Sequence, residues 1–432
     1  MQKISSYLEK FQLVITAGLF LFLTFNMHSR APIFSYHHVL WADAAGYYSY
    51  LPATFEFGWK AEHFPDSADI LTGQGFRLNS ETNSIETKYT YGVALLQLPF
   101  YLTGRLIAKI SGSNENGFGV IGHRMIMLAG VFYALAALYF LKRILKKMYG
   151  AFSASMAVLF LFSSTTLFYY GIDKAGFSHI YLFFLFTVLI NMVDRLIYSP
   201  DFFRSLIFFA ILLLCFLIRP TSVFAFPLIF LTGVKSKADL FELLHALRKN
   251  RKHYLLPACL ATLVLIPQFT YWYFISGNIF WYSYGDEGFS NLNNPHLLEL
   301  WFSPNNGLFV YTPIVAVLLI ISLLKFNRGI DSISFLVVFL FISWMFASWH
   351  DWRFGCSFGS RSFTEYLVFL AFPLAGLLNH LKEGRYHKLL LFCCLMIGYI
   401  AFVNINTIYT YDDCFYGDTW DYENFFKIIR FY

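Results

Sequence analysis

Charged residues are scarce in this chain of 432 residues: Asp, Glu, Lys and Arg together make up 13% of it, against about 25% in ordinary globular proteins. A chain with so little charge cannot cover itself with polar surface, which excludes a soluble enzyme, a disordered protein and a simple nucleic-acid binder. Hydrophobic residues reach 57% and aromatic residues 21%, and the mean hydropathy is +0.54. The chain must be solvated largely by lipid, and we expect an all-α polytopic membrane protein.

Several motifs of soluble chemistry are also missing. The sequence contains no CxxC, HExxH, Walker loop or GxGxxG motif, so nothing in it favours nucleotide-driven transport or nicotinamide chemistry. We therefore assign no cofactor and no metal ligand, and leave a divalent cation open. Of the six cysteines, Cys356 and Cys414 fall outside the apolar runs, where an oxidising compartment would permit a disulfide.

Long apolar runs divide the chain. A transmembrane helix needs about 20 apolar residues, and we expect residues 1–432 to form a single membrane domain with eleven such helices. The expected spans lie near 11–25, 120–141, 150–170, 178–197, 204–219, 221–234, 254–275, 307–325, 332–349, 363–381 and 389–408. The run 91–110 is also apolar, but Pro99 and two basic residues interrupt it, and we expect it to lie along the membrane surface.

The distribution of charge sets the orientation. With 91–110 at the surface, one side of the membrane carries 19 Lys and Arg against 7 Asp and Glu, and the other side carries 13 against 19. Cytoplasmic loops are enriched in basic residues, so we expect a cytoplasmic N-terminus and an outer C-terminus. The extracytoplasmic segments are then 28–119, 276–306 and 409–432, and any chemistry lies on the outer face.

The first outer segment offers a candidate acid. Asp43 lies in an aromatic setting next to Tyr47 and Tyr48, and low polarity can raise the pKa of a carboxyl group. Such a carboxylate suits a general base that removes a proton from a hydroxyl group. The alternative is a helix N-cap for the stretch that follows.

Basic residues recur at the outer ends of the expected spans. They are Lys88, Arg124, Arg219 and Arg361, the last with Glu365 one turn beyond it. Such cations could converge on a phosphate, where Arg offers a bidentate fork and Lys a point charge. The alternative is contact with lipid headgroups, which any basic residue at the end of a span can make.

Two further outer groups combine polar and aromatic side chains. Asp173 and His179 flank one outer turn, where a local ion pair and a buried histidine are the alternatives; His350, Asp351 and Trp352 form another group. Aromatic faces beside hydrogen-bonding groups suit sugar binding, although tryptophans at a membrane interface also form belts.

Taken in chain order, these segments resemble the GT-C class of integral-membrane glycosyltransferases, near the branch of the protein O-mannosyltransferases and lipid A aminoarabinose transferases. The resemblance rests on Asp43 with Tyr47 and Tyr48, Lys88, Arg124, Tyr169 to His179, Arg219-Pro220-Thr221, Pro295 to Thr312-Pro313, and Trp352 to Arg361. It implies a fold of about eleven transmembrane helices with extracytoplasmic interfacial helices.

The resemblance also implies an activity. A sugar would pass from a polyprenyl-phosphate carrier to a lipid, glycan or protein acceptor, with inversion, on the outer face of a bacterial-type inner membrane. Asp43 would be the base, and Lys88, Arg219 and Arg361 would bind the carrier phosphate. Tyr47, Tyr48, Asp173, His179, His350, Asp351 and Trp352 are candidates for the sugar or the acceptor. Membrane lipids are the other expected partner.

Two other classes stay open. A transporter or flippase for a lipid-linked saccharide would show repeats with polar residues near the midplane, and no repeat is apparent. A polysaccharide polymerase or ligase would place its Arg and His in one large late outer loop, and 276–306 contains no Arg.

Overall fold

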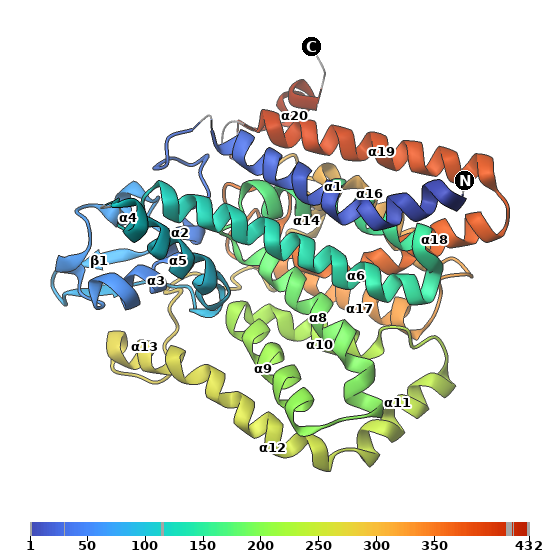
Figure 1. The fold of residues 1–432 in the computed structure, drawn as a ribbon, viewed down its shortest axis with the longest axis horizontal. Helices are drawn as coiled ribbons and strands as arrows, with labels where there is room; N and C mark the ends of the chain where they lie inside the picture. The colour runs from blue at the N-terminus through green and yellow to red at the C-terminus, as the bar shows by residue number, and fades with distance from the viewer. Residues whose placement is uncertain (1, 30, 114–115, 412–416, 418, 430–432) are drawn as a thin grey trace.

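The computed structural model describes residues 2–29, 31–113, 116–411, 417 and 419–429, and this part of the chain is mostly helical (Figure 1). The β-structure in it is one antiparallel hairpin of β1 (Arg77–Asn79) and β2 (Ser84–Glu86), with Leu78 opposite Ile85. The expected all-α architecture is confirmed.

Seven helical segments in the described residues are long and apolar enough to cross a membrane. They are α5 (Gly92–Ser111), α6 (Val120–Ser163), α8 (Ser178–Tyr198), the run of α12 (Lys252–Ala261), η5 (Thr262–Leu265) and α13 (Ile266–Ser276), then α17 (Ile330–Ala347), the run of η6 (Arg361–Leu370) and α18 (Ala371–Glu383), and α19 (His387–Thr410). The protein is therefore embedded in a membrane.

Shorter apolar helices complete this layer. They are the apolar part Gln12–His28 of α1 (Gln2–His28), then α9 (Phe202–Ile218), η4 (Pro220–Phe224) with α10 (Ala225–Leu231), and α16 (Pro313–Ser322). Each of the eleven expected spans thus has a helical counterpart. The number that cross the bilayer stays a prediction.

Two expected spans, 120–141 and 150–170, are parts of one element. Gly150 has φ 76° inside α6, and the helix bends sharply there, because a residue without Cβ adopts positive φ at little cost. Gln12 receives a hydrogen bond from Lys142 at 2.6 Å and donates one to the Ser155 carbonyl at 3.0 Å. Residues on both sides of Gly150 therefore lie beside the same point of α1. The chain continues through α7 (Thr166–Phe168) and η3 (Tyr169–Asp173).

The outer segments fold into short elements at one end of the long helices (Figure 1). The first contains α2 (Asp43–Tyr48), α3 (Tyr50–Pro52), η1 (Ala53–Phe57), η2 (Ala61–His63) and α4 (Ala68–Leu71). The later part of the chain adds α14 (Leu297–Phe302), α15 (Leu308–Tyr311) and α20 (Tyr422–Ile429). A second, smaller core that includes Tyr48, Phe76 and Phe118 lies beneath the first segment. This core packs the first segment against α5 and α6.

Helix α5 lies beside the end of α6 that faces the outer segment (Figure 1). Gly92, its first residue, packs against the C-terminal end of α9, and Gly104 packs against Met125. Met125 precedes Gly130, where the turn at Ala175 rests on α6. Helix α5 is also long and apolar enough to cross a membrane, so its expected position along the membrane surface stays a prediction.

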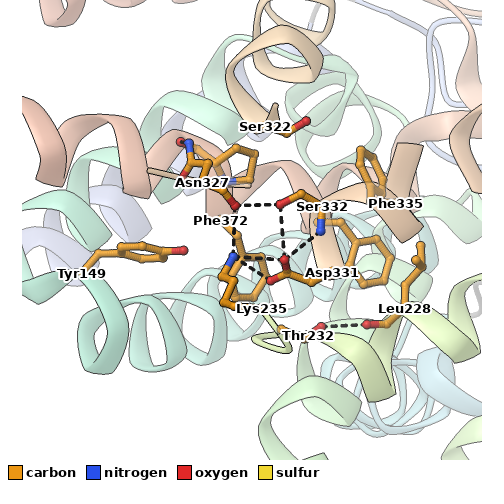
Figure 2. A pocket seen from close by; sticks show the side chains of 12 residues that line it. Tyr149, Leu228, Thr232, Lys235, Ser322, Asn327, Asp331, Ser332, Phe335 and Phe372 are labelled. Atoms are coloured by element: carbon orange, nitrogen blue, oxygen red, sulfur yellow. Dashed lines mark hydrogen bonds and ion pairs between the residues drawn. The ribbon is translucent and has the colours of Figure 1, made fainter. Parts of the chain in front are cut away.

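The opposite end carries α11 (Lys237–Lys249) and an ion pair that ties two loops together (Figure 2). The Lys235 ammonium lies 2.8 Å from Asp331 Oδ2 and donates to the Asn327 carbonyl at 3.2 Å, while Asp331 Oδ1 accepts from the Ser332 N–H at 2.7 Å. The cavity here measures about 30 Å³, enough for a water molecule and too small for a substrate.

Replacing Asp331 with Ala is expected to lower the free energy of unfolding by about 1 kcal/mol, because the partly buried N–H groups of Gly233 and Ser332 and the half-exposed Lys235 ammonium lose their acceptor. A melting curve of the purified protein in detergent measures the change. Glu383→Ala is the control, since its 3.7 Å pair with Lys382 is exposed and such pairs contribute little. Equal melting temperatures for both variants would show that the ion pair does not fasten the loops.

Candidate functional site

Asp43 is the first residue of α2, and its carboxylate has two partners from distant parts of the chain. Oδ1 accepts a hydrogen bond from the Tyr89 hydroxyl at 2.5 Å, and Oδ2 lies 2.9 Å from Arg361 Nη1. The residue before α2 is Ala42, and no side chain caps this helix. The alternative interpretation of Asp43 as an N-cap is therefore wrong.

The environment of Asp43 lowers its pKa, contrary to the expectation of a raised value. Burial by itself raises the pKa of this carboxyl group, but the Arg361 guanidinium, the Tyr89 hydroxyl and the Lys88 ammonium together hold it below its usual range. A carboxyl group with a lowered pKa stays ionised at all ordinary pH values. Asp43 is thus a carboxylate that can accept a proton.

A pH profile tests this arrangement. The acidic limb of the pH dependence of kcat/KM is expected below the ordinary aspartate range, because the ionised form of Asp43 persists to lower pH. Arg361→Met removes the strongest stabilising charge and leaves the effect of burial, so the limb is expected to move to higher pH. An unchanged limb in this variant would mean that Asp43 does not control the rate.

Lys88 lies next to Tyr89 and is held by the loop that precedes α14. Its ammonium is 2.6 Å from Glu287 Oε1 and lies 5.4 Å from the ring centre of Tyr284. The Lys88 carbonyl also accepts a hydrogen bond from Ser283 at 2.7 Å. The lysine is one third exposed, so its charge can be reached by a ligand that displaces Glu287.

Arg219 is held by two buried residues of neighbouring helices. It sits in extended conformation between α9 and Pro220, and its Nε lies 3.5 Å from Glu365 Oε1. His179, at the start of α8, approaches the other oxygen of Glu365 at 2.9 Å and Arg219 Nη1 at 3.1 Å. Glu365 is fully buried, so its charge requires these partners.

These groups meet in one place, which we call the Asp43 cluster: Asp43, Tyr47, Lys88, Tyr89, His179, Arg219, Tyr284, Arg361 and Glu365. Arg361 and Glu365 lie one turn apart on η6. The Tyr47 ring packs against the Tyr89 ring at a tilt, with ring centres 4.5 Å apart, and the charges of Arg219 and Asp43 both act on the Tyr47 hydroxyl. The four residues expected to act on an acceptor and a phosphate are therefore brought together.

Other predicted site residues lie elsewhere. Tyr48 points into the second core, where its hydroxyl donates to the Gly117 carbonyl at 2.5 Å. Asp173 pairs with His28 at 3.6 Å. Neither makes a direct contact with Asp43, and Tyr48 is a packing residue rather than a sugar-binding one.

The group at 350–352 forms a tight turn beside the loop that precedes α14. His350 donates its backbone N–H to the Gly288 carbonyl at 2.8 Å, and Asp351 accepts from the Gly355 N–H at 2.8 Å. Trp352 is 9% exposed and stacks on His296, with ring centres 5.8 Å apart. Its ring is covered, which leaves no open face for a sugar.

Other polar groups bear on the remaining predictions. Cys356 is disulfide-bonded, and its expected partner Cys414 lies outside the described residues. Within the described ranges, no group of three or more His, Cys, Asp or Glu side chains is arranged to hold a metal ion. His38 and His123 are in contact through Nδ1 atoms 2.6 Å apart, and burial lowers the pKa of His38 to about 3. The contact between these neutral imidazoles links the first outer segment to α6.

An apolar groove of about 760 Å³ opens beside the cluster, between α3 with η1 on one side and α5 and α13 on the others. Its walls include Trp59, Tyr91 and Phe274. Tyr50 also lines it, and the Tyr50 hydroxyl donates to the Tyr89 carbonyl at 2.9 Å. One residue of the groove wall is thus bonded to the backbone next to Lys88, although Lys88 itself does not line the groove.

The comparisons with known proteins are sparse. No protein-family model matches the chain, and no curated protein matches its sequence. Among solved structures, the fold is similar to the archaeal oligosaccharyltransferase AglB from Archaeoglobus fulgidus in complex with an inhibitory peptide and a dolichol-phosphate. The match has a TM-score of 0.48 and 13% sequence identity, and it covers 93% of this chain and 56% of that one. The chain therefore spans about half the length of that protein.

Proposed function

We propose that this protein is a GT-C-like glycosyltransferase that transfers a sugar from a polyprenyl-phosphate carrier to an acceptor at the extracytoplasmic face. The observation that carries the proposal is the convergence of Asp43, Lys88, Arg219 and Arg361 on a single cluster, in which Glu365 is the partner of Arg219. A carboxylate can remove the proton of the acceptor hydroxyl, and cations can stabilise the negative charge on a phosphate leaving group.

In this proposal Asp43 removes the proton of the acceptor hydroxyl as its oxygen attacks the anomeric carbon. The bond between that carbon and the phosphate oxygen breaks, the electron pair leaves with the polyprenyl phosphate, and the sugar is transferred with inversion. Arg219 and Lys88 stabilise the charge on the phosphate. Arg361 holds Asp43 ionised and is a further candidate for phosphate binding.

The apolar groove supports the choice of carrier. Tyr50 in its wall donates a hydrogen bond to the Tyr89 carbonyl, one residue from Lys88, and in this proposal the isoprenoid chain lies in the groove with its phosphate at the Lys88 ammonium. Burial of apolar surface gives roughly 25 cal/mol per Å², which favours a lipid tail there. In this structure the Lys88 ammonium pairs with Glu287, and the carrier phosphate would displace the Glu287 carboxylate.

The position of the cluster fits the extracytoplasmic side of a bacterial-type inner membrane. The cluster lies where the outer segment meets the ends of α8 and α9, and the opposite end carries the basic segment around α11. This agrees with the asymmetry of basic residues and with a cytoplasmic N-terminus. His179 serves to position Arg219, while Asp173, His350 and Asp351 remain candidates for contact with sugar or acceptor.

The test is transfer in vitro with purified protein and a panel of undecaprenyl-phosphate sugars, followed by mass spectrometry of the acceptor fraction. Product formed from a carrier-linked sugar and dependent on Asp43 is the expected result. A flippase would instead move a labelled carrier across sealed vesicles without forming product. A polymerase or ligase would use an oligosaccharide linked to the carrier and leave the single sugars untouched.

A further inference from the structure

A second cavity, of about 620 Å³ and polar, lies apart from both the apolar groove and the Asp43 cluster. It opens between the ends of α1 and α19 and the turn that follows η3, and Tyr36, His37, Asp173, Lys174 and Tyr411 are among the residues that line it. None of the proposed carrier-binding residues contributes to its walls. The transfer step proposed above uses none of these residues, and Asp173 alone among them is a candidate there for contact with the sugar or the acceptor.

Lys174 is the unusual residue of this cavity. It is 5% exposed, and its ammonium donates to the Tyr36 carbonyl at 2.5 Å and lies 4.7 Å above the Tyr36 ring. Among the described residues, no carboxylate oxygen lies within 4.0 Å of this ammonium. The adjacent carboxylate, Asp173, pairs with His28 instead. Burial lowers the pKa of Lys174, and the charge of Asp173 only partly offsets it. A buried ammonium without a close anion is costly.

The cavity is also a neighbour of the Asp43 cluster. Tyr169 lines it, and the Tyr169 and Tyr170 rings have centres 5.0 Å apart. The Tyr170 ring lies in turn 4.6 Å from the ring of His179. One pair of tyrosines therefore separates the cavity from the cluster.

We propose that this cavity binds an anionic saccharide, a sugar phosphate or a uronic acid, that forms the non-reacting part of the acceptor. Lys174 pairs with the anionic group, as ammonium ions do with phosphate and carboxylate. Asp173 and His37 bind sugar hydroxyls, and the tyrosine rings cover the apolar face of the sugar. The assignment to an acceptor rests on the proposed function; the binding itself does not.

The test uses the purified full-length chain without any carrier, and glucose 1-phosphate as the probe in calorimetric titration. Glucose 1-phosphate and glucuronate are expected to bind at least tenfold more tightly than glucose and inorganic phosphate. Lys174→Met is expected to weaken glucose 1-phosphate binding at least tenfold, and Lys174→Arg to restore much of it. Lys109→Met, at an exposed lysine of α5, is the matched control and is expected to change nothing.

Two results would overturn the inference: unchanged binding in Lys174→Met, or inorganic phosphate binding as tightly as glucose 1-phosphate. If Lys174→Met does not fold, Asp173→Asn is used instead. This variant is expected to weaken the binding of glucose 1-phosphate and to leave the binding of inorganic phosphate unchanged. Equal losses for both probes would then count against a saccharide site.

The two proposals fail in different ways. If the protein binds saccharide through Lys174 but transfers no sugar, the proposed function is wrong and the cavity is still a saccharide site. Transfer in which Lys174→Met leaves the KM for an anionic acceptor unchanged would remove the assignment of this cavity to the acceptor and leave the function.

Discussion

Replacing Asp43 with Asn is expected to lower the rate of sugar transfer by about 10²–10⁴-fold, the usual contribution of a general base. Asparagine has nearly the same size and shape, and its amide oxygen can still accept the hydrogen bond from Tyr89. The amide cannot take up a proton from the acceptor hydroxyl. The loss should therefore appear in kcat, with the affinity for the carrier preserved. The melting temperature is expected to fall as well, because the charge pair with Arg361 is lost.

A matched variant separates this effect from a general disturbance of the outer segment. Asp69 accepts hydrogen bonds from the Ile70 and Leu78 N–H groups at 2.9 and 3.1 Å, and Asp69→Asn is expected to leave kcat unchanged. Single-turnover measurements with saturating carrier give the comparison. Turnover retained in Asp43→Asn would assign Asp43 to holding Arg361 in place and would require a different base.

The sequence predicts the helices because a membrane imposes one simple rule on composition and length. The apolar runs between residues 11 and 408 become helices, and the break at Arg219-Pro220 lies where the sequence places it. Asp43, Lys88, Arg219 and Arg361 are also found from the sequence, because charge at the border of an apolar run is costly and rarely accidental.

The partners of these residues could not be predicted in the same way. Glu287 pairs with Lys88 across 199 positions of the chain, and Glu365 joins His179 across 186 positions. Such pairings depend on how the helices pack and not on any local pattern. An acid in the apolar run that begins at Arg361 was the one available signal for Glu365.

Short irregular elements also limit what a sequence predicts. Tyr47 and Tyr48 are adjacent in α2, yet the first faces Tyr89 in the Asp43 cluster and the second faces the core beneath the outer segment. A helix of six residues has too few turns to reveal by periodicity which side is buried. The lowered pKa of Asp43 was missed for a related reason, because Arg361, which lowers it, lies 318 positions away.

Arg219→Met is expected to have two effects, one on transfer and one on stability. Loss of a cation that stabilises the leaving phosphate should lower kcat by about 10²–10³-fold. Removal of Arg219 also leaves the fully buried Glu365 with His179 as its remaining ion-pair partner. Breaking a buried ion pair in this way costs about 3–5 kcal/mol, so the variant should melt at a clearly lower temperature.

The double variant Arg219→Met with Glu365→Gln distinguishes the two effects. It removes the uncompensated carboxylate, so most of the lost stability should return. Transfer should not return, because the cation that faces the phosphate is still missing. Glu365→Gln alone keeps Arg219 but loosens its position, and a smaller loss of kcat is expected. If the double variant regained both stability and transfer, Arg219 would be a structural partner of Glu365, and the leaving phosphate would depend on Lys88 and Arg361.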